Sequence, residues 1–397
     1  MSKTTIILRV AGKAFTSLSI LALAGLALTG LPGTAGAADE APAGAPPDAM
    51  SGASAAAPPP MAQGTELPIR KIPNIPAAAE AYYAPDDYHV IAQTQDPAAQ
   101  KPEGGRVGGA LTYIFTDDGK EVWRVNDRGQ DACSYFFPDQ KRIVWTSTKD
   151  RMDMPLGDWS NQDLYPRGAE LYTSDLKGEN IQRLTNNEYY EAEVSVSPNG
   201  KWIVFGRSVD GNLNIFRMRS DGTGEEQVTF TTDWQPGAPF YMPDNETIMF
   251  RAWRRSDYGK VKPTPMTVFT IKHDGTNLTQ RTFDRDMNWA PYPAPDGRHY
   301  VFVKIVEGRN WEVYLGDLGG DPPKRLTYNI GFDGLPSLSK NGKKMLFARS
   351  ETGRDNLNTY VMDVSSLNLG PENYKGVAAT PVPANPVLVT DFNDGKK

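Results

Sequence analysis

The hydrophobic and polar positions of this chain recur in a fixed order. A phrase of nine residues opens with a turn sequence and closes with an apolar run, as in 197–205 (SPNGKWIVF), 242–250 (MPDNETIMF) and 294–302 (APDGRHYVF). Proline at the first turn corner, followed by Asp, Asn or Gly, suits a tight turn. The apolar run that follows is typical of a strand buried on both faces. Each phrase therefore predicts a hairpin turn that leads into a buried strand.

Six copies of this phrase occur, 45 to 60 residues apart. In every copy the third position is Asp or Asn, and the seventh and eighth positions are apolar. A repeat of this length indicates a β-propeller or another array of repeated units. The copies occupy 84–92, 137–145, 197–205, 242–250, 294–302 and 339–347.

A second pattern separates the phrases, consisting of a strand, a polar Asp/Gly turn and another strand, as in 170–185 (ELYTSDLKGENIQRLT). Each repeat therefore contains four strands, which is the content of one propeller blade. The sixth repeat has no clear fourth strand, and 67–73 (LPIRKIP) stands at the matching distance before the first phrase. We expect this N-terminal strand to complete the last blade, so that the ring has no open edge.

The phrase resembles the TolB-type propeller repeat, whose signature is L-T followed by S-P-D-G-x-x-I-x-F. The resemblance covers about residues 67–365, with Lys340 in place of the proline in the sixth copy. It implies an all-β fold, namely a six-bladed β-propeller with four-stranded antiparallel blades. It also implies a periplasmic, non-enzymatic scaffold of the kind found in the Tol–Pal envelope system. TolB itself has an α/β domain before its propeller, whereas this chain has only a linker there.

The N-terminus (1–37) has the features of an export signal. Three basic residues precede an apolar stretch, 14–30, and the small residues Ala35-Gly36-Ala37 form a cleavage site. The alternative is an uncleaved membrane anchor, although the stretch is near the lower length limit for a span. Cys133 is the only cysteine, so no lipid-accepting cysteine follows the signal. We expect a periplasmic or secreted protein, cleaved near Ala37 and not inserted in the membrane afterwards.

Two segments flank the predicted propeller, which spans 67–370. Residues 38–66 are almost all Ala, Pro, Gly and small polar residues, so they predict a disordered linker. The segment 371–397 is Pro-rich and is expected to be a loose tail, although 385–392 can add an outer strand. A net charge of −6 argues against a nucleic-acid partner, and we expect a monomer.

The long insertions gather at one end of the predicted ring. The phrase turns and the Asp/Gly turns lie at one end, here called the turn end, and the loops before and after each phrase lie at the other, the insert end. The two longest insertions, 149–168 and 252–265, both fall at the insert end. Long loops on one rim of a rigid scaffold often carry binding. We therefore expect an envelope protein, a peptide segment or a saccharide to bind there.

Acidic and aromatic residues converge toward the mouth of the central channel at the insert end. The positions five and seven residues before the second residue of each phrase belong to the innermost strands, and several of them are carboxylates. Tryptophans and the arginines of the second insertion stand beside them. The predicted ligand- or partner-binding residues are Asp131, Glu191, Glu193, Trp234, Arg254, Arg255, Asp286, Trp289 and Asp333.

Two interpretations of these carboxylates stay open. In the first, they form a polar mouth with aromatic sides that binds a peptide segment or a saccharide, and Ca²⁺ in the central channel is an option. In the second, they cap strands or pair with Arg207, Lys304 and Arg349, which end strands near the same rim.

Residues suited to catalysis are scarce. His89, His273 and His299 are expected at the turn end, which argues against a Ser-His-Asp triad or a histidine-bound transition metal at the mouth. Cys133 is expected to be a small buried side chain. The sequence thus favours a non-enzymatic scaffold without a cofactor. The alternatives are a hydrolase or lyase that cleaves a polysaccharide or other polymer through channel carboxylates, and a sensor for a small ligand or cation.

Overall fold

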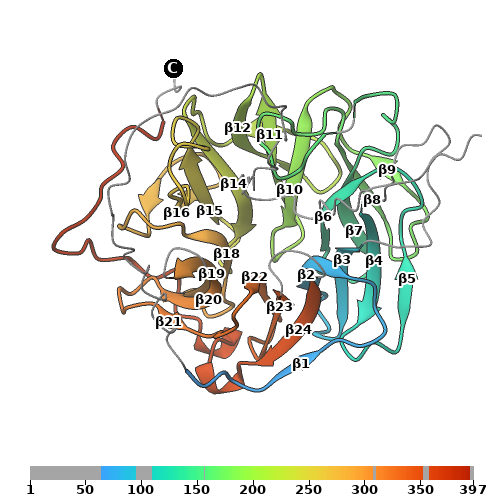
Figure 1. Ribbon diagram of the computed structural model, residues 1–397. Coiled ribbons are helices and arrows are strands. Elements are labelled where there is room, and N and C mark those ends of the chain that lie inside the picture. The colour runs from blue at the N-terminus through green and yellow to red at the C-terminus, as the bar shows by residue number, and fades with distance from the viewer. Residues whose placement is uncertain (1–63, 95–109, 156, 307–309, 352–356, 394–397) are drawn as a thin grey trace, which may run out of the picture.

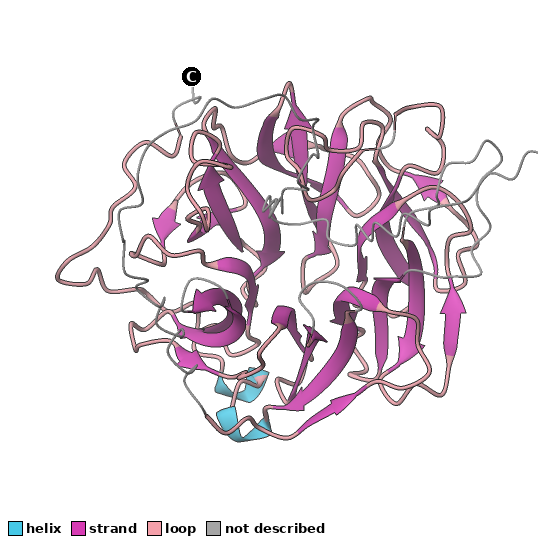
Figure 2. Cartoon of the chain, in the orientation of Figure 1, coloured by secondary structure: helices cyan, strands magenta, loops and turns pink. Residues whose placement is uncertain are grey.

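The computed structural model describes residues 64–94, 110–155, 157–306, 310–351 and 357–393. The predicted export signal and residues 38–63 of the predicted linker lie outside these ranges. The described residues form strands, apart from two short 3₁₀ helices, η1 (Ser365–Leu367) and η2 (Pro371–Asn373) (Figure 2). None of their helices has the length and apolar character needed to cross a membrane.

Four of the sheets in the described part of the chain are separate four-stranded meanders, arranged around a central axis (Figure 1). All their strand pairs are antiparallel, as predicted for propeller blades. The first strand of each meander lies nearest the axis. In chain order the strands are β2 (Ala78–Tyr83), β3 (His89–Thr94), β4 (Leu111–Thr116) and β5 (Val122–Arg124); β6 (Asp131–Phe136), β7 (Arg142–Ser147), β8 (Glu170–Asp175) and β9 (Gln182–Arg183); β10 (Tyr190–Val196), β11 (Trp202–Val209), β12 (Asn212–Arg219) and β13 (Glu226–Gln227); and β14 (Trp234–Tyr241), β15 (Thr247–Arg254), β16 (Thr267–Lys272) and β17 (Thr279–Gln280).

The remaining described strands form one eight-stranded sheet. Its strands are β18 (Trp289–Pro293), β19 (His299–Val306), β20 (Asn310–Asp317), β21 (Lys324–Arg325), β22 (Phe332–Leu338), β23 (Lys344–Ser350), β24 (Asn358–Asp363) and β1 (Ile69–Lys71). A single parallel pair, Trp311 with Phe332, joins its two halves. The rings of these two residues lie 5.7 Å apart, and this packing brings β20 beside β22. The pairing of the described strands thus gives five sheets, where the sequence predicts six separate blades.

The phrases make the turns that their sequences predict. In the copy at 242–250 the backbone N–H of Met242 donates to the carbonyl of Thr247, which closes the hairpin. The Asp244 carboxylate accepts from the N–H groups of Glu246 and Thr247, at 3.1 and 2.8 Å. This is the local hydrogen bonding that favours Asp in turns. The apolar run then enters β15, which is buried along nearly its whole length.

The N-terminal strand closes the last sheet, as predicted. β1 pairs with β24 in antiparallel register, with Arg70 opposite Val361 (Figure 1). The N–H of Ile72 donates to the carbonyl of Thr359 at 2.9 Å, and the Ile72 side chain is buried. The edge of β24 is therefore covered by a strand from the opposite end of the chain.

The ordered part of the chain begins before the predicted end of the linker. Glu66, the last residue assigned to the disordered linker, accepts a hydrogen bond from the N–H of Tyr328 at 2.8 Å. Its carboxylate also pairs with Arg349 at 2.5 Å. The half-buried guanidinium of Arg349 gives the Glu66 carboxylate a fixed partner. A residue in a disordered segment would have no such partner.

The C-terminal segment 371–393, predicted to be a loose tail, contacts the sheets at several points although most of its residues are exposed. The N–H of Val387 donates to the carbonyl of Phe283 at 2.8 Å, but the segment adds no strand among the described residues. Phe392 is 3% exposed, and the ring of Phe269 lies 4.8 Å from it. Asp391 pairs with Arg254 at 2.6 Å. One buried ring and one ion pair thus hold a segment whose composition predicts little order.

Burial of Ile72 gives a test of the closure. We expect Ile72→Ala to lower the free energy of unfolding by about 2–4 kcal/mol, because it removes methylene groups from a packed site and leaves a cavity. The exposed neighbour Lys71→Ala is the matched control and is expected to change it by less than about 0.5 kcal/mol. Denaturant unfolding of both variants measures the difference, and equal stabilities would contradict a closed ring held by this strand.

Candidate functional site

Each strand nearest the axis carries a β-bulge at the same place in its repeat. The pairing with the second strand shifts there, for example between Ala192 and Ser195 in β10. At each bulge one residue has a left-handed backbone, which costs a non-glycine residue roughly 1–2 kcal/mol. Among the described residues these are Glu80, Cys133, Glu193, Ala238, Ala290 and Leu335, with φ between 34° and 58°. They are the positions five residues before the second residue of each phrase.

Four aromatic side chains meet on the axis near the turn end. Tyr82, Tyr135, Phe240 and Tyr292 stand three residues before the second residue of their phrases and are called here the central aromatic cluster. The ring of Tyr82 lies 5.3 Å from that of Tyr135 and 5.6 Å from that of Phe240. Phe240 and Tyr292 are 4.8 Å apart. Because these rings come from opposite sides of the ring of sheets, the cluster fills the channel at this level.

A fully buried ion pair lies on the insert side of this cluster. Arg251 of β15 pairs with Glu193 of β10 at 2.9 Å, and both side chains are 0% exposed. The N–H of Ala238 donates to the other carboxylate oxygen of Glu193 at 2.6 Å. A Cβ at Gly237 would collide with both Arg251 and Glu193, so glycine is required beside the pair. The Nε and Nη1 atoms of Arg251 have no hydrogen-bond partner among the described residues.

Glu80 lies beside this pair in an unusual protonation state. Burial raises the pKa of its carboxyl from 4.5 to about 8, and the negative charge of Glu193 adds to the rise. Hydrogen bonds from Cys133 and Tyr82 act in the opposite direction but do not offset burial. Burial also raises the pKa of the Cys133 thiol. Burial therefore favours the neutral form of both groups, which lie beside the ion pair. Glu80, Cys133, Glu193 and Arg251 are called here the buried polar cluster.

The first insertion covers the buried polar cluster from the insert end. Tyr165 of this insertion stacks on Tyr190, with ring centroids 4.1 Å apart and planes 14° from parallel. Trp159 packs against Tyr190 from the same insertion, at 5.9 Å. Burial raises the pKa of the Tyr165 hydroxyl, and the charge of Glu193 adds to the rise. The first insertion thus packs two aromatic side chains on Tyr190, which lies three residues before Glu193 in β10.

The two insertions contact each other, which confirms that they lie on the same rim. Arg255 pairs with Asp163 at 3.2 Å, and the indole N–H of Trp253 donates to Gln162 at 2.9 Å. Arg255 is 38% exposed. Of the predicted site residues, it is the one placed on the surface between the insertions.

Three predicted site carboxylates pair with the cations that the second interpretation named. Glu191 pairs with Arg207 at 2.5 Å, and its carboxylate is 0% exposed. Asp286 pairs with Lys304 at 2.8 Å. Burial raises the pKa of Glu191, and the positive charge of Arg207 opposes this rise. The structure therefore confirms the interpretation in which these carboxylates form ion pairs near the rim.

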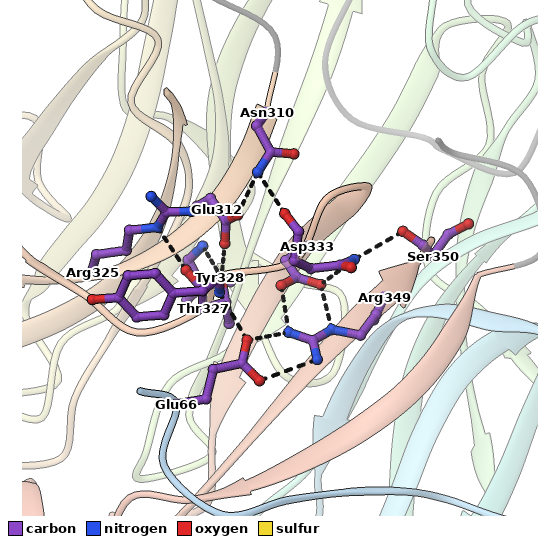
Figure 3. Close-up of polar contacts among 11 residues, drawn as sticks. Glu66, Asn310, Glu312, Arg325, Thr327, Tyr328, Asp333, Arg349 and Ser350 are labelled. Atoms are coloured by element: carbon purple, nitrogen blue, oxygen red, sulfur yellow. Dashed lines mark hydrogen bonds and ion pairs between the residues drawn. The ribbon is translucent and has the colours of Figure 1, made fainter. Parts of the chain in front are cut away.

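Asp333 takes part in the largest of these networks (Figure 3). Arg349 lies between Asp333, at 2.7 Å, and Glu66, at 2.5 Å. On the neighbouring strand Glu312 accepts from Arg325 at 2.7 Å, and burial raises its pKa to about 7. Burial also raises the pKa of Asp333, while the hydrogen bond and the charge of Arg349 lower it. This network joins the N-terminal segment to the rim rather than leaving Asp333 open to a ligand.

Asp131 is buried, and the hydrogen-bond partners described below are neutral groups rather than cations. It accepts from the N–H of Thr112 at 2.8 Å and from the amide of Asn126 at 2.7 Å. Burial raises its pKa to about 6, against the effect of these hydrogen bonds. Asp131 of β6 thus links the first two sheets by accepting from the backbone of Thr112 in β4.

The two predicted tryptophans lie in the packed interior. Trp289 is 0% exposed and contacts the ring of Trp311 at 5.3 Å. Trp234 is 5% exposed, and its indole N–H donates to Asp391 at 3.2 Å. Arg254 lies over Trp234 and pairs with the same carboxylate. Trp234 and Arg254 are thus occupied by the C-terminal segment of the chain itself, and a role of the nine residues in binding stays a prediction.

The histidines lie at the turn end, as predicted. His89 and His299 each contact an Asp of their own phrase, Asp86 at 2.7 Å and Asp296 at 2.5 Å. The described residues contain no group of three or more His, Cys, Asp or Glu side chains that could hold a metal ion.

Protonation of Glu80 generates a prediction on stability. Between pH 4.5 and 8 the folded chain keeps a proton on Glu80 that the unfolded chain loses. Because of this proton, the free energy of unfolding falls by about 1.4 kcal/mol for each pH unit that the pH rises. Glu80→Gln removes the titrating group and with it this pH-dependent loss of stability. We expect the stability of the variant relative to the unmodified chain to increase through this window and to level off above about pH 8. Urea unfolding at a series of pH values measures it, with the exposed Glu179→Gln as the control. A difference that does not vary with pH would contradict the assignment.

Comparison with known proteins supports the fold and leaves the function open. No family model matches the chain. An uncharacterised protein of Agrobacterium fabrum is 28% identical over 142 residues, which is 34% of this chain and 47% of that protein, so the chain spans about half the length of this curated relative.

TolB of Acinetobacter baumannii matches 64% of this chain and 60% of its own with 20% identity and a TM-score of 0.48. Hydrazine synthase of Kuenenia stuttgartiensis covers 74% of this chain and 45% of its own with 12% identity and a TM-score of 0.52, which shows similarity of fold alone. The repeated phrase and the ring of sheets identify the fold as a β-propeller.

Proposed function

We propose that this chain is a non-enzymatic scaffold of the cell envelope that binds a protein or peptide segment through its insert end. The observation that carries the proposal is a set of large apolar side chains exposed on neighbouring loops there. Leu164 is 58% exposed, Val261 is 42% exposed and Tyr189 is 40% exposed. Exposed apolar side chains grouped on one surface are characteristic of protein-binding sites.

Ion pairs connect the loops that carry these side chains. Arg255 of the second insertion contacts Asp163, next to Leu164. Arg167 pairs with Glu188, next to Tyr189, at 2.8 Å. Loops fixed in this way lose less conformational entropy on binding than free loops would. Arginine beside aromatic and aliphatic side chains is also a composition that binding surfaces favour.

The scaffold is best counted as a propeller of six blades. The two halves of the eight-stranded sheet are each an antiparallel meander, joined by one parallel pair between Trp311 and Phe332. Each half begins with a bulged strand, β18 or β22, as each separate sheet of the described chain does. Counting the halves as two blades assigns one blade to each copy of the phrase.

The pairing of the rim carboxylates supports a scaffold over the alternative of a polymer-cleaving enzyme. Cleavage of a glycosidic bond needs two carboxyl groups that are free to act on the substrate. The charges of Glu191 and Asp333 are instead balanced by Arg207 and Arg349, and both carboxylates are fully buried.

Substitution of the exposed apolar side chains tests the proposal. The double variant Leu164→Asp with Val261→Asp introduces charge into the proposed contact surface. We expect it to weaken binding of the partner by about tenfold or more, because a charge in the apolar centre of an interface is costly. The partner is first captured from envelope extract by crosslinking to the full chain, and its affinity is then measured with the purified components.

Val122 and Ile181 provide a matched control at the turn end. They are 42% and 43% exposed, so Val122→Asp with Ile181→Asp makes an equivalent change away from the proposed surface. Equal affinity of the captured partner for both double variants and for the unmodified chain would rule out the insert end. Failure to capture any partner reproducibly would argue against a scaffold.

Export of the chain is a separate prediction. We expect the protein secreted by a bacterial host to begin after Ala37, because the small residues at 35–37 follow an apolar stretch as in cleaved signal peptides. Mass spectrometry of the periplasmic fraction measures the mature N-terminus. A full-length chain recovered in the membrane fraction would support the anchor alternative instead.

A further inference from the structure

The turn end of the ring holds a cavity of about 310 Å³. Three rings of the central aromatic cluster, Tyr135, Phe240 and Tyr292, are among its lining residues, and most of the other lining side chains are apolar. The second residue of every copy of the phrase also lines it, namely Pro85, Pro138, Pro198, Pro243, Pro295 and Lys340. A concave, largely apolar space of this size with one polar anchor is the kind that small ligands occupy.

Lys340 is the one charged side chain among the described residues that line the cavity. Its ammonium donates to the hydroxyl of Tyr135 at 2.7 Å and to that of Tyr292 at 3.2 Å. The nearby Asp87 carboxylate instead accepts from the backbone N–H groups of Lys340 and Asn341, at 2.5 and 3.3 Å. In the described part of the chain no carboxylate forms an ion pair with the Lys340 ammonium, whose hydrogen bonds go to the two phenol oxygens.

The hydrogen-bond donors of this group exceed its acceptors. The ammonium has three N–H donors and the two phenols add one O–H each. Two of the N–H groups donate to the two phenol oxygens. One phenol O–H donates to the other hydroxyl, which is 2.9 Å away. One N–H and one O–H remain, close together and beside a positive charge. Two adjacent donors and a cation match the two oxygens of a carboxylate.

We infer that the turn-end cavity binds a carboxylate attached to an apolar body. The carboxylate accepts from the Lys340 ammonium and from one phenol, and the apolar body packs against the ring of prolines. The apolar lining disfavours phosphate, because a dianion needs more donors than this cavity offers to replace its water. The ammonium disfavours a cationic ligand. This site lies at the opposite end from the proposed partner surface, so the two proposals can fail independently.

Calorimetric titration of the full chain with hydrocinnamate tests the inference, with hydrocinnamamide as the uncharged ligand of the same shape. We expect saturable binding of the acid and about tenfold or more weaker binding of the amide, because a charged hydrogen bond contributes more than a neutral one. Lys340→Met removes the charge and keeps most of the side-chain volume, and it should weaken binding of the acid by a similar factor. Lys343→Met, an exposed lysine of the same turn, is the matched control and should leave binding unchanged.

A second variant keeps the test decisive if Lys340→Met does not fold. Lys340→Gln removes the charge but keeps N–H donors for the two phenol oxygens, so it should weaken binding of the acid without altering binding of the amide. A tripeptide ending in Phe, with a free or an amidated C-terminus, shows whether the carboxylate comes from a small acid or from a peptide end. Equal binding of acid and amide would overturn the inference. So would an unchanged affinity in Lys340→Met, or the absence of saturable binding by every carboxylate tested.

Discussion

The left-handed residue at the bulge of each innermost strand is the constraint on which the interior of this protein depends. Each of these non-glycine residues adopts a backbone that is unfavourable by itself, and the same conformation recurs at equivalent positions from Glu80 to Leu335. Strain of this kind persists only where surrounding packing enforces it. Here the bulges set which side chains reach the axis, since Glu80 and Glu193 stand at the bulges and Tyr82 and Phe240 stand two residues beyond theirs.

This arrangement divides the axis into layers with different chemistry. Near the turn end the central aromatic cluster fills the channel, and toward the insert end the buried polar cluster holds a protonated carboxyl beside an ion pair. Tyr82 belongs to the aromatic layer and donates to Glu80 of the polar layer at 3.0 Å, so the layers are in direct contact. These two layers separate the two ends of the ring, and each end is therefore considered as a separate surface.

Much of the architecture could be predicted because it depends on local turn sequences. The phrase specifies its hairpin through Pro, Asp and Gly, and the match between 67–73 and the missing strand predicted the pairing of β1 with β24. The ion pairs of Glu191 and Asp333 could be anticipated from the basic residues that end neighbouring strands. The joining of two predicted blades into one eight-stranded sheet could not, because the parallel pair between Trp311 and Phe332 depends on tertiary contact.

The interior site was harder to predict, for physical reasons. A left-handed backbone at Glu80 or Cys133 has no sequence signal, because neither residue favours that conformation. The burial of Arg251 also has no local sequence signal, since it depends on Gly237, which leaves room for the guanidinium beside Glu193. Docking of the C-terminal segment depends on one ring, Phe392, within a sequence too polar and Pro-rich to predict order. The aromatic cluster did have a signal, namely an aromatic residue two positions before the phrase in four of the repeats.

Near-symmetry of the ring makes single departures from the repeat informative. Equivalent positions converge on the axis, so a residue that differs from its counterparts changes the chemistry of a shared central space rather than of one blade. Lys340 replaces a proline that the other copies keep, and it thereby introduces a cation where the repeat would supply an apolar ring. The substitution also removes a residue suited to the turn, yet the N–H of Ser339 still donates to the carbonyl of Lys344 and closes the turn. Asp87 of the neighbouring repeat accepts from the backbone of Lys340 and Asn341. A compensated departure of this kind indicates that the cation at the axis, not the turn, is the feature that distinguishes this repeat.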